Sequence, residues 1–172
     1  MLVPAQLYRD EISRELTARW YIPRFSHYFS GNREEVRIAD NAHWRRDFAY
    51  EDMHHRLGGY FSYAYNESAR SMSNFGLVGF QKNNIAFLRE VKAHILYMIV
   101  TGQAQRIEFW AFTDNPVMKL YRRWAEQYGG VEIATLHRVA FYEGAYHDMS
   151  VFEFLRENIL SHITVLPEVC YE

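Results

Sequence analysis

The sequence has little cysteine and almost no net charge, and both shortages exclude classes of protein. One of its 172 residues is a cysteine, Cys170, which excludes an internal disulfide and a cysteine-based metal cluster. Its 19 basic and 21 acidic residues leave a formal net charge of −2, so neither sign dominates the surface. We therefore do not expect bulk nucleic-acid binding.

Long apolar runs are also lacking. The most apolar run, Ala93 to Val100, contains His94 and is far too short to span a bilayer. The first residues, MLVPAQLYRDE, have no apolar core of the kind that signal peptides carry. We expect no membrane association, and a location in the reducing environment of the cytoplasm.

Histidines with the spacing of metal ligands are lacking too. The region from residue 27 to 55 has four histidines but no H-x-x-x-H pair, and the neighbours His54 and His55 would point to opposite faces of a strand. We expect no metal. A metal-dependent base-modifying enzyme is a third hypothesis that rests on these histidines alone.

What the chain has in plenty is aromatic residues, at 17% of the sequence. Most of the rings follow strand or helix periodicity, which favours core packing over an aromatic-lined pocket or partner surface. The same periodicity predicts a single α+β domain. Helices are expected over residues 5–20, 85–101 and 116–128, strands over 44–50, 60–65, 72–80, 106–112, 131–142 and 146–155, and a short helix in the tail 156–172.

The stretch from Asn74 to Gly102 organises the rest. A strand with two glycines, Gly76 and Gly79, leads through a polar loop into the longest helix. Glycines inside a strand often mark a bulge or the close approach of another group. A helix that starts after a strand presents free backbone N–H groups, which suit an anion such as a phosphate. The alternative is an ordinary strand–turn–helix crossover.

Over about residues 58–155 the expected elements run strand, strand, helix, strand, helix, strand, strand, an order that resembles the GCN5-related N-acetyltransferase (GNAT) superfamily. Two local patterns support the resemblance. Residues 81–86 read Q-K-N-N-I-A, which is similar to the family loop Q/R-x-x-G-x-G/A. Asn84 stands in place of the first glycine, and asparagine is the non-glycine residue best able to adopt the left-handed conformation expected there. Residues 114–121 retain the family's Leu-Tyr, with Asn115 one place late. No clean strand is evident before the first helix.

The resemblance implies a GNAT-like, mostly antiparallel twisted sheet with a splayed parallel pair and flanking helices, in a divergent member of the superfamily. It divides one domain, 1–172, into an acceptor-side part (1–57), an acyl-CoA-binding core (58–155) and a tail (156–172). The implied function is direct transfer of an acyl group, expected to be acetyl from acetyl-CoA, to an amine acceptor. The implied cofactor-binding residues are Val78, Phe80, Gln81, Lys82, Asn83, Asn84, Ala86 and Asn115.

The same resemblance suggests catalytic residues. Tyr121 matches the family tyrosine that often protonates the departing thiolate, and core packing is its alternative role. Glu108 and His137 are the candidate bases that would deprotonate the amine, and structural roles are the alternative for both.

A different class of function also fits the sequence: a non-catalytic structural or interaction protein on the same fold, such as a viral assembly component or an inhibitor. The strands 131–142 and 146–155 could pair between subunits to form a homodimer.

Overall fold

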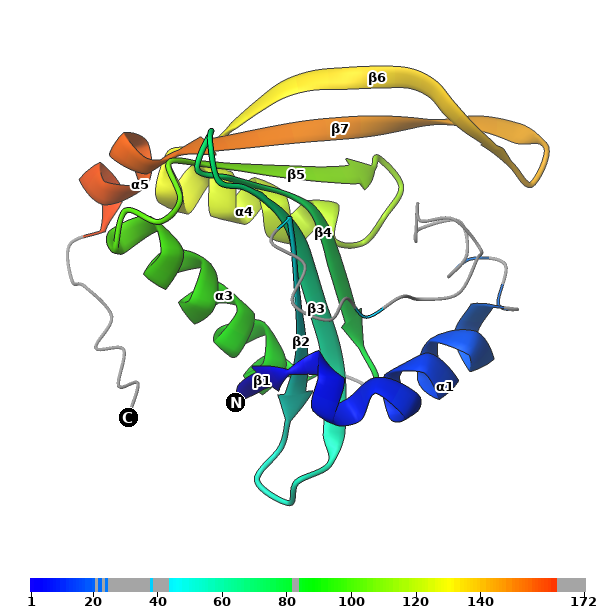
Figure 1. Cartoon of the computed structure of the whole chain (residues 1–172). Coiled ribbons are helices and arrows are strands. Elements are labelled where there is room, and N and C mark those ends of the chain that lie inside the picture. The colour runs from blue at the N-terminus through cyan, green and yellow to red at the C-terminus, as the bar shows by residue number, and fades with distance from the viewer. Residues whose placement is uncertain (21, 23, 25–37, 39–43, 82–83, 164–172) are drawn as a thin grey trace. The chain divides into compact units, whose positions relative to one another are not determined.

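The computed structural model describes residues 1–20, 22, 24, 38, 44–81 and 84–163 (Figure 1). Its strands form a seven-stranded sheet in the order β1-β2-β3-β4-β5-β7-β6. The elements are β1 (Leu2–Pro4), a 3-10 helix η1 (Ala5–Tyr8), α1 (Arg9–Trp20), β2 (Arg45–Glu51), β3 (Leu57–Asn66), β4 (Ser71–Gly79), α3 (Ile85–Val100), β5 (Arg106–Phe112), α4 (Met118–Tyr128), β6 (Val131–Tyr142), β7 (Ala145–Leu155) and α5 (Arg156–His162).

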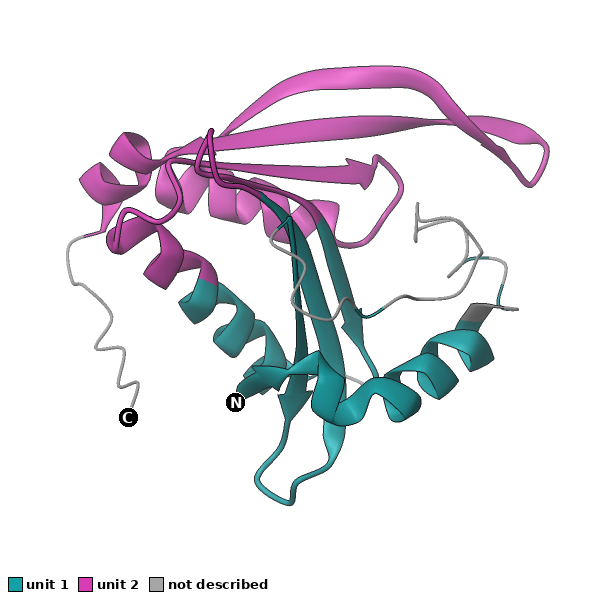
Figure 2. Ribbon diagram, viewed as in Figure 1, with its two compact units in different colours: residues 1–65, 75–94 teal, residues 66–74, 95–172 magenta. Residues whose placement is uncertain are grey.

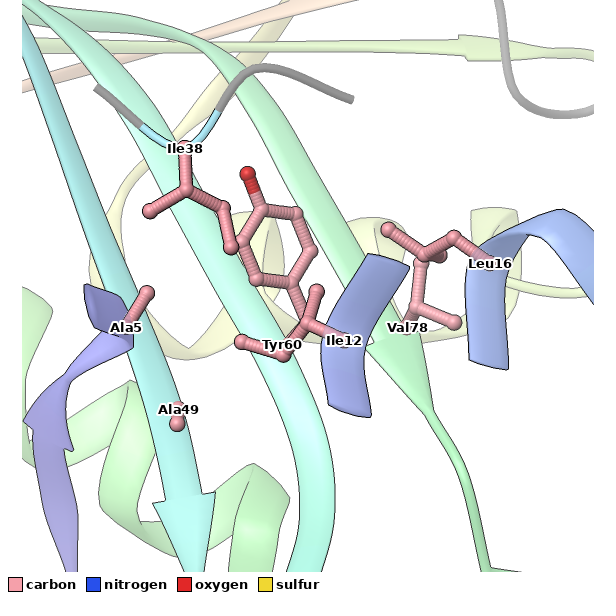
Figure 3. Packing of buried hydrophobic residues seen from close by; sticks show 7 residues of the cluster. All are labelled: Ala5, Ile12, Leu16, Ile38, Ala49, Tyr60 and Val78. Atoms are coloured by element: carbon pink, nitrogen blue, oxygen red, sulfur yellow. The ribbon is translucent and has the colours of Figure 1, made fainter. Parts of the chain in front are cut away.

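The chain divides into two compact units, one of residues 1–65 and 75–94 and the other of residues 66–74 and 95–172 (Figure 2). In the first unit, β1 and β2 pair antiparallel, as do β2 and β3. One face of these strands packs against α1, because Ile12 and Leu16 lie one turn apart and both are fully buried. Figure 3 shows Leu16 beside Val78 and Ile12 near Tyr60 in this cluster. Each aliphatic side chain buried here contributes roughly 1.5–3 kcal/mol.

A charged network is buried on the same face. Asp47 is 7% exposed, and it accepts hydrogen bonds from Tyr60 Oη at 2.5 Å and Arg45 Nε at 3.0 Å. Arg45 Nη2 also donates to Ser62 Oγ at 3.2 Å. A Cβ on Gly76 would lie 2.6 Å from that Ser62 oxygen, so this glycine permits the close approach that the sequence suggested.

The opposite face carries an aromatic layer, because adjacent strand residues such as Tyr60 and Phe61 point to opposite sides. Phe48 lies 4.7 Å from the His94 ring of α3, measured between centroids, and Phe61 and Phe75 pack beside them. The Tyr63 hydroxyl lies 3.0 Å from His94 Nε2. Burial lowers the pKa of His94 from 6.5 to about 4, so its imidazole is neutral near pH 7.

In the second unit β7 lies between β5 and β6 and pairs antiparallel with both. The start of β4 pairs parallel with the start of β5, through Ser71↔Arg106 and Met72↔Ile107. The helix α4 has a buried stripe at helical spacing, and Gly129 ends it in the left-handed conformation with φ 66°. The buried stripe consists of Met118, Tyr121, Trp124 and Tyr128.

The α+β class, the mixed sheet with its parallel pair and the order of elements are therefore as the sequence predicted. One expectation was wrong: a strand does precede the first helix, and β1 was missed because it has three residues and ends in proline. The alternation of Val36 and Ile38 around Arg37 also suggested a short strand, and Val36 and Arg37 lie outside the described residues. The single domain stays a prediction. No helix in the described ranges is long and apolar enough to cross a membrane.

The depressed pKa of His94 predicts a pH dependence of stability. Below pH 6.5 the unfolded chain takes up a proton that the folded imidazole accepts only near pH 4, so the free energy of unfolding should fall by up to roughly 3 kcal/mol across this window. Urea unfolding of wild type and His94→Gln at pH 7, 6, 5 and 4 measures this change in the free energy of unfolding. The variant should lose less stability on acidification than wild type, and equal losses in both proteins would contradict the assignment to His94.

Candidate functional site

Asn84 determines how α3 begins. Its Oδ1 accepts the backbone N–H of Phe87 at 3.0 Å, and its Nδ2 donates to the carbonyl of Gly58 in β3 at 3.1 Å. The first contact is an N-cap on the third helical residue, a role that asparagine fills well. Asn84 is not among the described residues with a positive φ. The expected left-handed conformation was therefore wrong, since the side chain satisfies the helix start in its place.

The first turn of α3 still presents donors. The N–H groups of Ile85 and Ala86 lie at the first and second helical positions, where no intrahelical acceptor exists, and both residues are exposed. The partial positive charge of a 16-residue helix adds to them. Gln81, which precedes the loop, is exposed. Lys82 and Asn83 lie outside the described residues.

At the end of β4, Val78 and Phe80 are engaged within the first unit, and their role in binding a cofactor stays a prediction. Val78 is 6% exposed and belongs to the core beneath α1. The N–H of Phe80 donates to the Gly58 carbonyl at 3.0 Å, and its own carbonyl accepts Arg19 Nη2 at 3.2 Å. The backbone groups of Phe80 are thus engaged within the first unit.

The sequence had singled out Gly79 as a position where another group could approach closely, without counting it among the cofactor-binding residues. Successive residues of a strand point their backbone N–H and C=O groups toward opposite edges, so those of Gly79 face away from the edge at which Phe80 bonds to Gly58. Gly79 is exposed, and a Cβ there would meet one atom within 4 Å, the carbonyl oxygen of Gln81 at 3.6 Å.

In the second unit, Asn115 orders the turn that leads into α4. Its Oδ1 accepts the N–H of Val117 at 3.0 Å, and its carbonyl accepts the N–H of Met118 at 3.0 Å. The helix itself begins at Met118 and its N-cap is Val117, so Asn115 acts in the turn before α4. A role in binding a cofactor stays a prediction for Asn115.

Tyr121 lies in an aromatic pocket of the second unit. Its ring stacks on Phe109 with centroids 4.7 Å apart, and it meets Phe152 edge-on at 6.0 Å. Burial raises the pKa of the Tyr121 hydroxyl, so the group carries its proton throughout the physiological range. No residue in the described part of the chain forms a hydrogen bond with this hydroxyl. Tyr121 therefore packs in the core with its hydroxyl protonated, and its role as the acid stays a prediction.

Glu108 is held by its neighbours on the sheet. Arg106 Nη2 lies 2.6 Å from Glu108 Oε2, and the indole N–H of Trp110 donates to Oε1. Arg106 also binds Glu153 at 2.5 Å on the adjacent strand β7. Both carboxylate oxygens of Glu108 are thus occupied, which favours the structural alternative.

His137 lies on an irregular part of β6, and its side chain is 75% exposed. Its Nδ1 lies 2.9 Å from Asp148 Oδ2, and the other oxygen of Asp148 accepts the N–H of Arg138 at 2.9 Å. These two contacts, that with the Arg138 backbone first, lower the pKa of Asp148. Sequence reasoning missed Asp148, although a hairpin placing residues 131–142 against 146–155 brings these segments together.

The three candidate catalytic residues are not joined to one another. Within the described ranges no hydrogen bond or ring contact links Tyr121, Glu108 and His137. Nor do three or more His, Cys, Asp or Glu side chains of the described residues group so that they could hold a metal ion. Of the histidines noted in the sequence, His27 and His43 lie outside the described residues.

No protein-family model and no curated protein sequence matches this chain. Solved structures do match it. Spermidine N-acetyltransferase from Vibrio cholerae, in complex with CoA and spermine, is 20% identical, with 93% of this chain and 97% of that chain covered and a TM-score of 0.71. The spermidine/spermine N-acetyltransferase SpeG from Vibrio cholerae, in complex with manganese ions, is 24% identical over 70% and 71% of the two chains, with a TM-score of 0.58. The chain therefore has the fold of the GCN5-related N-acetyltransferases, which its element order had predicted.

Proposed function

We propose that this chain is an N-acetyltransferase that moves an acetyl group from acetyl-CoA directly to an amine. The observation that carries the proposal is the start of α3, where Ile85 and Ala86 are exposed and their backbone N–H groups have no intrahelical acceptor, the arrangement that a pyrophosphate site at a helix start uses. A protein of the same fold has been solved with CoA and spermine bound.

The side chains of this protein would catalyse the reaction by transferring protons. The amine must be neutral so that its nitrogen lone pair can attack the thioester carbonyl carbon while the bond from carbon to sulfur breaks. Tyr121 gives its proton to the departing sulfur, because burial keeps its hydroxyl protonated. A base takes the proton that the attacking amine loses.

Of the two candidate bases, His137 has the side chain that is less engaged by its neighbours. Asp148 holds its Nδ1, which leaves Nε2 without a partner among the described residues. This is the arrangement in which a carboxylate orients an imidazole for proton transfer. Glu108 would first have to release Arg106 and Trp110.

Polyamines are the first acceptors to test, since the two matched proteins are named for spermidine or for spermidine and spermine. We also propose that the enzyme works in the cytoplasm as a homodimer. A single cysteine in 172 residues suits a reducing compartment.

The test combines binding and turnover. Acetyl-CoA at about 100 times its dissociation constant should stabilise the folded chain by roughly 2.7 kcal/mol, measured as a shift in Tm. Incubation with acetyl-CoA and spermidine, spermine or other amines should release the CoA thiol, which a thiol reagent detects. The absence of both a shift at millimolar acetyl-CoA and thiol release would reject the proposal and leave a non-catalytic protein on this fold.

Tyr121→Phe separates catalysis from packing. The change removes a hydroxyl that no described residue binds and keeps the ring against Phe109, so Tm should hardly move. The turnover number should fall by about 10²- to 10⁴-fold with little change in KM for acetyl-CoA, the usual contribution of a general acid. Tyr128→Phe, another buried tyrosine of α4, is the matched control and should keep its turnover. Wild-type turnover in Tyr121→Phe would leave the tyrosine a core residue.

Asn84→Asp tests the anion site. Aspartate keeps an oxygen to cap the Phe87 N–H but loses the donor to Gly58, so stability should change by no more than about 1 kcal/mol. The added negative charge should raise KM for acetyl-CoA by about tenfold or more, because it repels the pyrophosphate. Asn66→Asp is the control, since Asn66 Oδ1 binds the backbone N–H of Ala69 in a turn. An equal effect of both changes, or none of either, on KM would argue against phosphate binding at α3.

A further inference from the structure

The layer of side chains between α4 and the strands β5 and β7 contains a buried polar group without a partner. Ser150 of β7 is completely buried, and its hydroxyl forms no hydrogen bond with any residue in the described part of the chain. An unpaired hydroxyl in an apolar layer is costly, and buried polar groups are usually bonded to protein or to an internal water. A water at such a site needs two or more polar partners, so Ser150 requires a second one nearby.

The residues around Ser150 are those that hold Tyr121. Alternation along β7 places Ser150 on the same face as Phe152, which the Tyr121 ring meets edge-on at 6.0 Å. Phe152 pairs with Phe109, on which the Tyr121 ring stacks, and Ser150 pairs with Ala111, the next β5 residue on that face. Ser150 thus lies one step along the sheet, about 7 Å, from the two rings that hold the tyrosine.

The direction of α4 carries the Tyr121 hydroxyl toward this part of the sheet. Gly130, just after the helix, packs against the ring of Phe154, which pairs with Ile107 near the start of β5. The helix therefore runs back from the end of β5 toward its start. Because helical side chains lean toward the N-terminus of their helix, the Tyr121 hydroxyl extends toward the level of Ser150.

The other neighbour of Ser150 on this face reaches solvent. Asp148, two residues earlier on β7, has a side chain that is 36% exposed, and its carboxylate lies 2.9 Å from His137 Nδ1. A row of side chains on one face of β7 thus begins at solvent beside Asp148, passes Ser150 and ends against Tyr121. The candidate acid lies at the inner end of this row, and the candidate base lies at its outer end. All of these residues belong to the second unit (Figure 2).

The proton that Tyr121 gives away has to be replaced. When its O–H bond breaks and the S–H bond of CoA forms, a phenolate is left among aromatic rings that have no proton to give. Burial disfavours this charge, and the raised pKa of the Tyr121 hydroxyl has the same cause. The tyrosine must therefore regain a proton before it can act again.

We propose that Ser150 is a positioning residue that returns this proton: its hydroxyl holds a water against the Tyr121 hydroxyl, at the inner end of a path that opens to solvent beside Asp148. The water protonates the phenolate, the Ser150 hydroxyl gives its proton to that water, and a solvent water replaces the proton of Ser150. The hydroxide left in solvent takes up the proton that the base removed from the amine, so Ser150 and Tyr121 both end unchanged. This role rests on the acetyltransferase function proposed above.

Ser150→Ala removes the hydroxyl, and rapid-mixing kinetics measures the effect. The first turnover should keep its wild-type rate, because Tyr121 already carries the proton that it gives. Later turnovers should be about tenfold slower or more, with KM for acetyl-CoA unchanged, because the return of the proton then limits the rate. Tyr121→Phe should slow the first turnover too, which separates the two roles. Loss of rate in all turnovers of Ser150→Ala alike, or in none, would overturn the proposal.

Thr135→Val is the matched control. Thr135 pairs with Ser150 across the two strands, is exposed, and loses a hydroxyl in the same way. It should keep the wild-type rate in the first and in later turnovers. Both variants should keep the Tm shift with acetyl-CoA, which shows that they fold and bind the donor. Equal slowing of later turnovers in both variants would remove the special role of Ser150.

Crystal structures of wild type and Ser150→Ala test the path without any measurement of activity. Wild type should have a water within hydrogen-bond distance of both the Ser150 and the Tyr121 hydroxyl, and the variant should lack it. Wild type without this water would overturn the proposal, whatever its activity. An ordered water in a wild type that releases no CoA thiol would instead reject the acetyltransferase function, and with it the role of the path in catalysis.

Discussion

The two hydrogen bonds of the Asn84 side chain hold the central part of the first unit together. One satisfies the backbone N–H of Phe87 in the first turn of α3. The other joins the Asn84 side chain to the carbonyl of Gly58 in β3. The carbonyl of Gly58 also receives the N–H of Phe80, so a single oxygen fixes both the end of β4 and the start of the helix. Everything proposed about anion binding depends on this junction, because it decides which backbone donors stay exposed. Asn84 satisfies the N–H of Phe87, the third helical residue, and leaves those of Ile85 and Ala86 without an intrahelical acceptor.

Much of this fold could be predicted because the spacing of apolar residues along the sequence indicates which side chains are buried. The residues from Arg106 to Phe112 alternate as a strand should, and the strand has these bounds in the structure. The strand β1 was missed because three residues contain less than one full alternation. Asn84 shows a different limit. Asparagine favours both the left-handed conformation and the N-cap, and only the position of the neighbouring Gly58 carbonyl decides between them.

The candidate catalytic residues show the same division between local and distant information. That Tyr121 lies on a buried helix face follows from the spacing of Leu120, Tyr121 and Trp124, and its altered acidity follows from that burial. The contact between His137 and Asp148 does not follow from spacing, because it depends on the irregular register of β6 against β7. The engagement of Glu108 by Arg106 and Trp110 is local to one strand face, at i−2 and i+2, and alternation could have identified it.

The close approach at Gly76 has a consequence for how this sequence can vary. Any side chain there would push Ser62 aside, and Ser62 is one of the groups that hold Arg45 over the buried carboxylate of Asp47. A methyl group on β4 would thus disturb a charge two strands away on β2, where an unpaired carboxylate is costly. Position 76 is therefore coupled to Asp47 through Ser62 and Arg45, and the tolerance of one site to change depends on the residues present at the others. In a set of related chains, a larger residue at 76 should occur together with the loss of this buried ion pair.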